Sequence, residues 1–237
     1  MKEWSYDPSP SISQSIGEQL TVFPRERDIT FSLLRRVGTV FLRIFLKIYF
    51  RLEISGREHI PQNRSFVLVG NHASHLDAVA LACALPISSV DHTFAVAAKD
   101  YFFTSFARSF FAAVFVNALP FDRHKKIRES LELCADALNA SEQALLMFPE
   151  GTRSLDGKIQ PFKRGIGILT AGTGRLVVPA FIAGAFEAWP KGLSFPKPKK
   201  VRVRIGPPLN FLNVERNAEG FQRVAQKVED AVRALQV

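Results

Sequence analysis

Cysteine is scarce in this sequence: Cys83 and Cys134 are the only two, and they form no CxxC motif. Both fall in segments with apolar residues at helical spacing, so we expect two buried free thiols in a reducing compartment rather than a disulfide framework. Long apolar runs are also lacking, because none approaches the roughly 18–20 residues that a membrane-spanning helix needs. The first residues show no signal-peptide pattern. These absences predict a protein inside the cell without a spanning helix.

Acidic residues are outnumbered by basic ones. The 237 residues include 31 Lys and Arg against 22 Asp and Glu, a formal net charge of +9. This balance indicates a polyanionic partner, which could be nucleic acid, an anionic membrane, a phosphorylated substrate or an acidic carrier protein. Charge alone does not distinguish these partners. The length suffices for one large domain with a full core.

The N-terminal part of the chain differs in composition from the rest. Residues 1–27 are rich in Ser and Pro and are predicted to be a mobile tail. Residues 28–52 are predicted to form an amphipathic helix with one narrow basic stripe, consisting of Arg36, Arg43, Lys47 and Arg51. A wide apolar arc beside such a stripe is typical of a helix that lies in a membrane interface. The alternative is a helix packed on its own domain or on a dimer partner.

Short apolar strands alternate with helical segments over residues 53–237. The predicted strands are 65–70, 93–98, 114–117, 143–148, 176–182 and 201–205, and the predicted helices are 74–85, 100–113, 125–138, 165–172 and 218–235. This alternation favours a single α/β domain with a mixed, mostly parallel sheet flanked by helices. Open α/β folds bind their ligands at loops that follow the strands, so polar residues in those loops are the candidates for function.

His72 and Asp77 follow the first of these strands. They are too far apart to share one face of a continuous helix, so they can meet only if His72 lies in a turn and Asp77 in the first helical turn. Asp77 would then fix the tautomer of His72 and leave its other ring nitrogen free as a base. A structural hydrogen bond is the alternative. His75 is predicted to lie behind the site or to face solvent, and the other histidines show no metal-ligand spacing.

Residues 148–154, with the sequence FPEGTRS, follow another predicted strand. Gly151 allows the backbone to approach a ligand closely. Three residues then supply hydrogen-bond donors that suit phosphate oxygens: Thr152, Arg153 and Ser154. A buried Glu150 is expected to form an ion pair with Arg153, and Lys163 precedes a helix whose N-terminus favours anions. The alternative is a charged turn without function.

Together these segments resemble the glycerolipid acyltransferase family, the lysophosphatidic acid acyltransferases and their relatives. The resemblance covers residues 53–212 and rests on motifs in the family's order: His72 with Asp77, Phe121-Asp122-Arg123, FPEGTRS at 148–154, and Val178-Pro179-Ala180. The second motif departs from the family, which often has Gly and an aliphatic residue before Asp-Arg. This departure affects the acceptor contacts expected at Arg123 and not the chemistry.

The resemblance implies transfer of a fatty acyl group from acyl-CoA or acyl carrier protein to the free hydroxyl of a lysophospholipid. The expected acceptor is 1-acyl-sn-glycerol 3-phosphate, which becomes phosphatidic acid. His72 would be the general base and Asp77 its orienting partner. The implied acceptor and phosphate contacts are Arg123, Glu150, Gly151, Thr152, Arg153 and Lys163. Pro179 would shape the acyl-binding region, and no cofactor, metal or covalent acyl-enzyme is implied.

A lipid product requires contact with a membrane. Besides the helix at 28–52, the Phe-rich segment 101–115 could supply a contact, or it could be a core helix. The basic stretch 191–204 could face anionic lipid, dock a carrier protein or coenzyme A, or be solvated. We expect no nucleic-acid partner, because the most basic helix is also the most hydrophobic one.

The expected location is the cytoplasmic face of the inner membrane, as a peripheral protein. Two alternatives to the reaction above remain. One is the same chemistry on another acceptor, such as a different lysophospholipid, a lyso-amino-lipid or glycerol 3-phosphate. The other is a membrane-bound scaffold without turnover.

Overall fold

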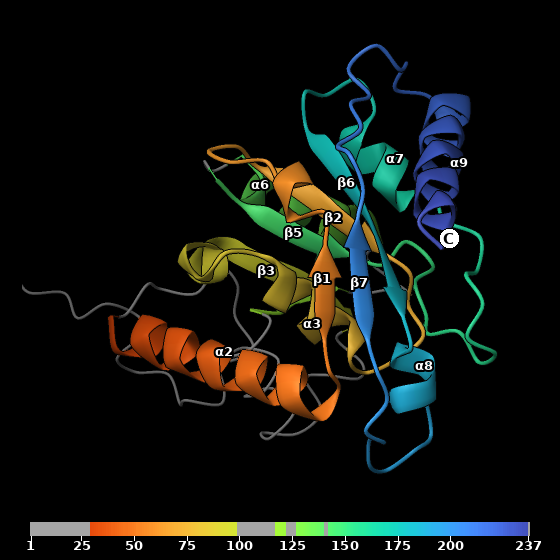
Figure 1. Ribbon diagram of the computed structural model, residues 1–237. Helices are drawn as coiled ribbons and strands as arrows, with labels where there is room; N and C mark the ends of the chain where they lie inside the picture. Colours follow the sequence, from red (N-terminus) through yellow and green to blue (C-terminus); the bar gives the residue numbers. More distant parts are fainter. Residues whose placement is uncertain (1–28, 99–116, 122–126, 140–141, 237) are drawn as a thin grey trace, which may run out of the picture.

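The computed structural model describes residues 29–98, 117–121, 127–139 and 142–236 (Figure 1). The predicted tail at 1–27 and the predicted helix at 100–113 lie outside the described residues, and so does Arg123.

Within the described residues, one sheet contains seven strands in the order β1-β7-β6-β2-β5-β3-β4. The strands are β1 (Glu53–Ser55), β2 (Phe66–Gly70), β3 (Thr93–Ala98), β4 (Leu119–Phe121), β5 (Ala144–Met147), β6 (Leu176–Ala183) and β7 (Arg202–Ile205). Every neighbouring pair is parallel except β6 and β7, which are antiparallel. The prediction of a mixed, mostly parallel sheet in one α/β domain is confirmed.

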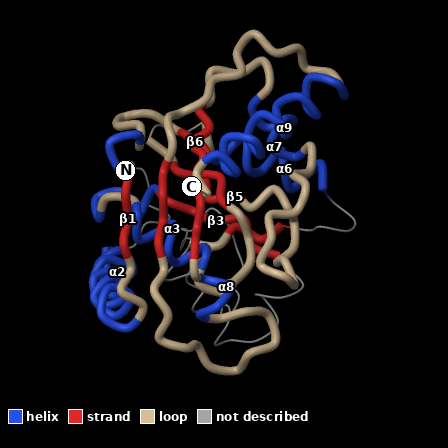
Figure 2. The backbone as a smooth tube through the Cα atoms, turned by 45° about the vertical axis from the view of Figure 1, so that its right-hand side comes forward, coloured by secondary structure: helices blue, strands red, loops and turns tan. Residues whose placement is uncertain are grey.

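Helices cover both faces of this sheet (Figure 2). They are α2 (Ile29–Tyr49), α3 (Asp77–Ala84), α6 (Ile127–Ala137), α7 (Gly165–Thr170), α8 (Ala185–Ala188) and α9 (Ala218–Ala234), with short 3₁₀ turns at Arg57–His59 and Ile87–His92. The predicted strand at 114–117 is wrong at its described end, since Asn117 is not in a strand and β4 begins at Leu119. Helix α3 begins at Asp77, after the predicted start near residue 74.

Strand β2 contributes residues to both hydrophobic clusters of the core. Phe66 and Leu68 are buried in a cluster with residues of α3 and with Leu46 of α2. Val67 and Val69, which alternate with them, are buried in a second cluster with residues of α6, α7 and α9. Each buried side chain of this size contributes roughly 1.5–3 kcal/mol by leaving water. Because β2 is buried on both faces, the loop that follows it is rigidly placed.

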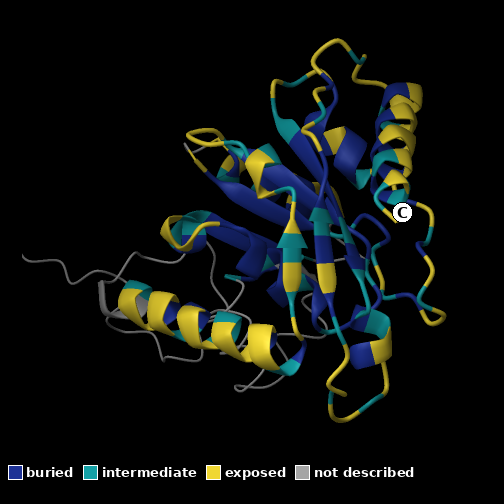
Figure 3. Ribbon diagram, in the orientation of Figure 1, coloured by how far each residue is buried: buried dark blue, intermediate teal, exposed yellow. Residues whose placement is uncertain are grey.

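Helix α2 contacts the domain through arginines and through apolar residues such as Leu46, and it leaves a wide apolar surface exposed (Figure 3). Arg35 is buried and donates to the carbonyl of Val90 at 2.6 Å, while Arg36 pairs with Asp91 at 2.8 Å. Arg43 donates to the carbonyl of Leu85. The exposed large apolar side chains of α2 are Leu33, Leu34, Val37, Val40, Phe41, Ile44, Phe45 and Ile48, and Lys47 is exposed among them.

Two residues of the predicted basic stripe, Arg36 and Arg43, bond to the domain. Among the described helices, none is long and apolar enough to cross a membrane.

Candidate active site

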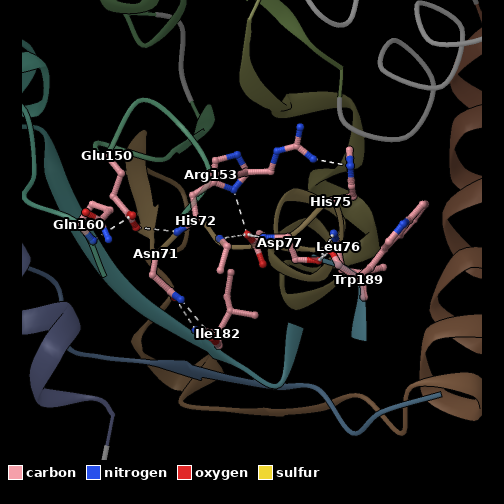
Figure 4. A network of polar contacts seen from close by, with 12 residues as sticks. Asn71, His72, His75, Leu76, Asp77, Glu150, Arg153, Gln160, Ile182 and Trp189 are labelled. Carbon is pink, nitrogen blue, oxygen red and sulfur yellow. Dashed lines mark hydrogen bonds and ion pairs between the residues drawn. The ribbon is translucent and has the colours of Figure 1, made fainter. Parts of the chain in front are cut away.

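Three neighbouring strands end at the site. Strands β6, β2 and β5 are adjacent and parallel, so their carboxyl ends lie at the same edge of the sheet. The loop after β2 carries His72, the loop after β5 carries Glu150, and the chain after β6 reaches Trp189 by way of α8 (Figure 4). Segments that are far apart in the sequence therefore meet where open α/β folds bind ligands.

Asn71 extends the pairing of β2 with β6 beyond the last backbone pair. Its side-chain Oδ1 accepts from the N–H of Ile182 at 2.8 Å, and its Nδ2 donates to the carbonyl of Ile182 at 3.1 Å. The amide thus imitates one strand residue, and it is buried. The backbone turns away from the sheet directly after this anchor, which places His72 in the turn.

His72 and Asp77 are in direct contact. The distance from His72 Nδ1 to Asp77 Oδ2 is 2.9 Å. The same oxygen accepts from the N–H groups of Ala73 and Ser74 at 2.7 Å each. Asp77 is fully buried, at 0% exposure, and is the first residue of α3, where the positive end of the helix dipole favours a carboxylate. The sequence argument, which required His72 in a turn and Asp77 at a helix start, predicted this geometry.

The other ring nitrogen of His72 is open. Because Nδ1 faces the carboxylate, it carries the proton in the neutral ring, and Nε2 keeps its lone pair. No described residue contacts Nε2 by a hydrogen bond, and the His72 side chain is 23% exposed. The ring stacks on Phe148 with centroids 4.3 Å apart, which limits its rotation. A solvent-accessible imidazole with a fixed tautomer is suited to general-base chemistry.

Glu150 fastens the loop after β5 to the loop after β2. Its carboxylate accepts from the backbone N–H of His72 at 2.7 Å and from that of Gln160 at 3.0 Å. The N–H of Ser154 in turn donates to the carbonyl of His72 at 2.8 Å. The FPEGTRS segment therefore holds the histidine backbone at both its N–H and its carbonyl.

Burial raises the pKa of Glu150 to about 7, against the opposing effect of the two backbone N–H donors. The predicted ion pair with Arg153 is wrong: the polar partners of Glu150 among the described residues are these backbone groups. The backbone N–H groups of His72 and Gln160 lie within hydrogen-bond distance of the Glu150 carboxylate. The side chain of Arg153 points away from that carboxylate, toward His75 (Figure 4).

Arg153 contacts His75 instead. Its Nη1 donates to Nε2 of His75, and the His75 ring lies against Trp189 with centroids 5.1 Å apart. An arginine cannot accept a hydrogen bond, so the contacted nitrogen of His75 is unprotonated. The prediction that His75 stands behind the site or faces solvent missed this contact. No local signal could have found it, because the two residues are 78 positions apart.

Gly151 and Lys163 lie together. A Cβ at Gly151, where φ is +74°, would come within 2.8 Å of Nζ of Lys163, so the ammonium group lies directly over the glycine backbone. Thr152 is exposed. Ser154 does not fulfil its predicted role as a phosphate donor: it is buried, and its hydroxyl donates to Asp156 at 2.8 Å.

Pro179 lies inside the sheet. It pairs in register with Val69 of β2, and its carbonyl accepts from the N–H of Gly206 at 2.8 Å. The predicted contribution of Pro179 to acyl binding stays a prediction.

Both cysteines are buried free thiols, as predicted. Burial raises the pKa of Cys83 to about 11 and that of Cys134 to about 12, so neither thiol ionises near neutral pH. A thiolate is the nucleophilic form of cysteine. Nucleophilic catalysis by either residue is therefore disfavoured. Among the described residues, no group of three or more His, Cys, Asp or Glu side chains is arranged to hold a metal ion.

Comparisons with known proteins agree on one family. A sequence model of the acyltransferase family matches residues 51–183. A 1-acyl-sn-glycerol-3-phosphate acyltransferase of Limnanthes alba is 29% identical over 159 residues, which are 67% of this chain and 54% of that protein. The 1-acyl-sn-glycerol-3-phosphate acyltransferase alpha of Mus musculus is 27% identical over 164 residues, 68% of this chain and 55% of that protein. The chain thus spans about half the length of these relatives.

A solved structure is similar over nearly the whole chain. The crystal structure of the 1-acyl-sn-glycerophosphate (LPA) acyltransferase PlsC from Thermotoga maritima has a TM-score of 0.64 and 25% sequence identity. The similarity covers 90% of this chain and 84% of that one.

Proposed function

The chain belongs to the acyltransferase family, and we propose from this premise that it acylates the free hydroxyl of 1-acyl-sn-glycerol 3-phosphate to give phosphatidic acid. The acyl donor is a thioester of coenzyme A or of an acyl carrier protein. The observation that carries the proposal is the pair formed by buried Asp77 and His72, 2.9 Å apart, with Nε2 of His72 open. The acceptor is suggested by the names of the relatives, which are 1-acyl-sn-glycerol-3-phosphate acyltransferases.

The proposed reaction is a direct transfer. Nε2 of His72 removes the proton from the acceptor hydroxyl as its oxygen attacks the thioester carbonyl. The tetrahedral intermediate then collapses, the carbon–sulfur bond breaks, and the imidazolium returns its proton to the departing thiolate. Asp77 stabilises the imidazolium throughout. One ester forms and one thioester breaks, so no net proton, electron or cofactor is needed, and no residue is acylated.

The phosphate of the acceptor is proposed to bind at the FPEGTRS segment. Arg153 supplies a guanidinium, whose planar donors suit phosphate oxygens. Lys163 places a second cation over the backbone of Gly151. The buried carboxylate of Glu150 holds this segment against the His72 turn, and we assign it a positioning role. These contacts would bring the acceptor hydroxyl and the imidazole together.

The proposed working place is the surface of an anionic membrane, on its cytoplasmic face. Supporting evidence comes from α2, whose arginines bond to the domain while its apolar side is exposed. Monomeric proteins rarely expose apolar faces of this extent unless something covers them. A nucleic-acid partner does not account for this apolar face. Peripheral attachment would bring the site to lipids that stay in the bilayer.

The proposal is tested with purified protein, an acyl thioester and a panel of acceptors in mixed micelles. The panel contains lysophosphatidic acid, lysophosphatidylcholine, lysophosphatidylethanolamine and glycerol 3-phosphate, and products are identified by mass spectrometry. We expect phosphatidic acid from lysophosphatidic acid at a kcat/KM well above that for the other acceptors. Preferred acylation of another acceptor would contradict the proposed substrate while leaving the chemistry intact. Silence of a folded protein with both donor types would favour a non-catalytic scaffold.

A further inference from the structure

The chain after α8 forms a closed loop at the edge of the site. This loop consists of residues 189–198 and is called the 189–198 loop below. At its base, the N–H of Lys197 donates to the carbonyl of Ala188 at 2.8 Å, and Nε1 of Trp189 donates to the carbonyl of Leu193 at 2.8 Å. Its start is tied to the catalytic turn, because Ser74 Oγ donates to the carbonyl of Trp189 at 2.7 Å. The loop is thus held together internally and joined to the residues around His72.

The outer part of this loop combines an exposed aromatic ring with exposed cations. Phe195 is 80% exposed, the highest value among the large apolar side chains described. Three exposed lysines surround it in the sequence, namely Lys191, Lys197 and Lys199. No acidic residue occurs between positions 188 and 200. A phenylalanine in water is unfavourable by itself, and it is not packed against the domain here.

The rest of the basic stretch is used within the fold. Lys200 and Arg202 both pair with Glu53, at 2.5 Å and 3.2 Å. Arg204 donates to the carbonyl of Leu235 at 2.9 Å. In contrast, no described residue forms an ion pair with Lys191 or Lys197 of the loop, or with Lys199 directly after it. The lysines of this stretch that make no ion pair with a described residue therefore lie around Phe195 in the sequence.

The loop lies at the same end of the molecule as helix α2. Tyr49, the last residue of α2, donates from its hydroxyl to the carbonyl of Pro196 at 3.0 Å. Figures 1 and 2 show, in two orientations, the loop after α8 at the end of the molecule where α2 also lies. Ile48, which precedes Tyr49 in α2, is 74% exposed, so an exposed apolar side chain of α2 lies next to the residue that contacts the loop.

We propose that the 189–198 loop is a second membrane contact, in which Phe195 enters the interface of an anionic bilayer and the three lysines lie among the lipid phosphates. Aromatic and cationic side chains together suit this interface, whose headgroups are anionic and whose depth is apolar. The inference rests on the membrane part of the proposed function. With α2 it gives two attachment points, and because the loop is tied to Ser74, it orients the His72 turn toward the lipid.

The decisive experiment places an environment-sensitive dye on the loop. Cys83 and Cys134 are buried, so a nitrobenzoxadiazole label attaches selectively to a new cysteine at Phe195→Cys. The matched control is Leu212→Cys, which carries the same dye at an exposed apolar position. Leu212 belongs to the segment between β7 and α9, which Figure 1 shows at the top of the view, with the loop after α8 at the bottom. A third variant, Phe41→Cys, reports on α2. The vesicles contain phosphatidylglycerol and phosphatidylcholine, with phosphatidylcholine alone for comparison.

We expect a blue shift and increased emission at Phe195→Cys and Phe41→Cys on anionic vesicles, with little change at Leu212→Cys. A response at position 41 without one at 195 would overturn the loop contact and leave membrane attachment by α2 standing. No response at either position would contradict both. A response at 195 to an acidic acyl carrier protein but not to vesicles would overturn the lipid contact and assign the loop to the donor protein.

The lysines are tested separately by sedimentation with vesicles. The triple variant Lys191→Ser, Lys197→Ser and Lys199→Ser should lower partitioning onto anionic vesicles, by about fivefold for each lysine removed, and should change little on phosphatidylcholine. Lys227→Ser, at an exposed position on α9, is the matched control and should bind as the wild type does. Equal partitioning of the triple variant and the wild type would contradict the role of the loop charges.

Discussion

Replacing Asp77 with Asn separates the charge of this side chain from its hydrogen bonds. Oδ2 of Asp77 accepts from Nδ1 of His72 and from two backbone N–H groups, while Oδ1 is buried without a hydrogen-bond partner. An asparagine can place its oxygen where Oδ2 lies and retain those three contacts. Its NH₂ group then occupies the buried position of Oδ1, an atom for which the structure shows no hydrogen-bond partner.

The expected consequences differ for stability and for catalysis. A buried amide donor without a partner costs about 1–3 kcal/mol of stability. The variant also loses the negative charge that stabilises the imidazolium formed when His72 takes the acceptor proton. General-base catalysis is worth about 10²–10⁴ in rate, so we expect kcat to fall by a factor in this range, equivalent to about 3–5 kcal/mol. KM for the acceptor should change much less.

The assay measures thiol release at saturating substrates, together with the melting temperature of each variant. Asp91→Asn is the matched control, because it removes a largely buried carboxylate that pairs with Arg36 on α2. Asp91 precedes β3, whereas the site lies at the opposite edge of the sheet, after β2 and β5. This control should lower the melting temperature and leave kcat nearly unchanged. If Asp77→Asn melts like Asp91→Asn and also keeps a near wild-type kcat, the assigned role of the carboxylate charge is refuted.

Three further variants test the FPEGTRS segment. Arg153→Ala should weaken acceptor binding by about 2–5 kcal/mol, seen as a raised KM with a smaller effect on kcat, whereas the exposed Arg128→Ala on α6 should leave KM unchanged. Gly151→Ala should cost about 1 kcal/mol of stability, because φ is +74° there, and should raise KM by displacing Lys163; an unchanged KM would contradict this placement. For Glu150, whose pKa is raised from 4.5 to about 7 by burial, the folded protein binds a proton that the unfolded chain has released. Its stabilising contribution is therefore full below pH 4.5 and lost as the pH rises through about 7, a change of about 3 kcal/mol that denaturant titrations should detect in the wild type and not in Glu150→Gln. Parallel pH profiles for the two proteins would contradict this assignment.

The central strands β2 and β5 could be predicted because their apolar residues are continuous. Residues 66–69 read Phe-Val-Leu-Val and form β2, which is buried on both faces. Strand β1 was missed, since its three residues are stabilised by pairing with β7 and have no apolar pattern. Strand β4 contains Pro120, which a sequence argument reads as a break. An edge strand tolerates proline because one side of its backbone makes no ladder bonds, and β4 lies at the edge.

The contacts of the site that are local in the sequence could be predicted, and those between distant segments could not. His72 and Asp77 are five positions apart, so a turn and a helix start were enough to bring them together. The contact between Arg153 and His75 depends on β2 and β5 being neighbours, which local patterns do not report. The carboxylate of Glu150 was assigned the wrong partner because it accepts from backbone N–H groups of His72, in the loop after β2, and of Gln160, ten residues further along its own loop.

The central claim is that His72 is the base for a direct acyl transfer, and it is tested most directly by comparing the wild type with His72→Ala. Purified proteins are given lysophosphatidic acid and a long-chain acyl thioester, and thiol release is measured beside phosphatidic acid formation. The account predicts equal amounts of both products from the wild type, dependence on both substrates, and loss of both in a folded His72→Ala variant. Thiol release by the wild type without an acceptor beyond slow hydrolysis, or turnover that persists in His72→Ala, would contradict it.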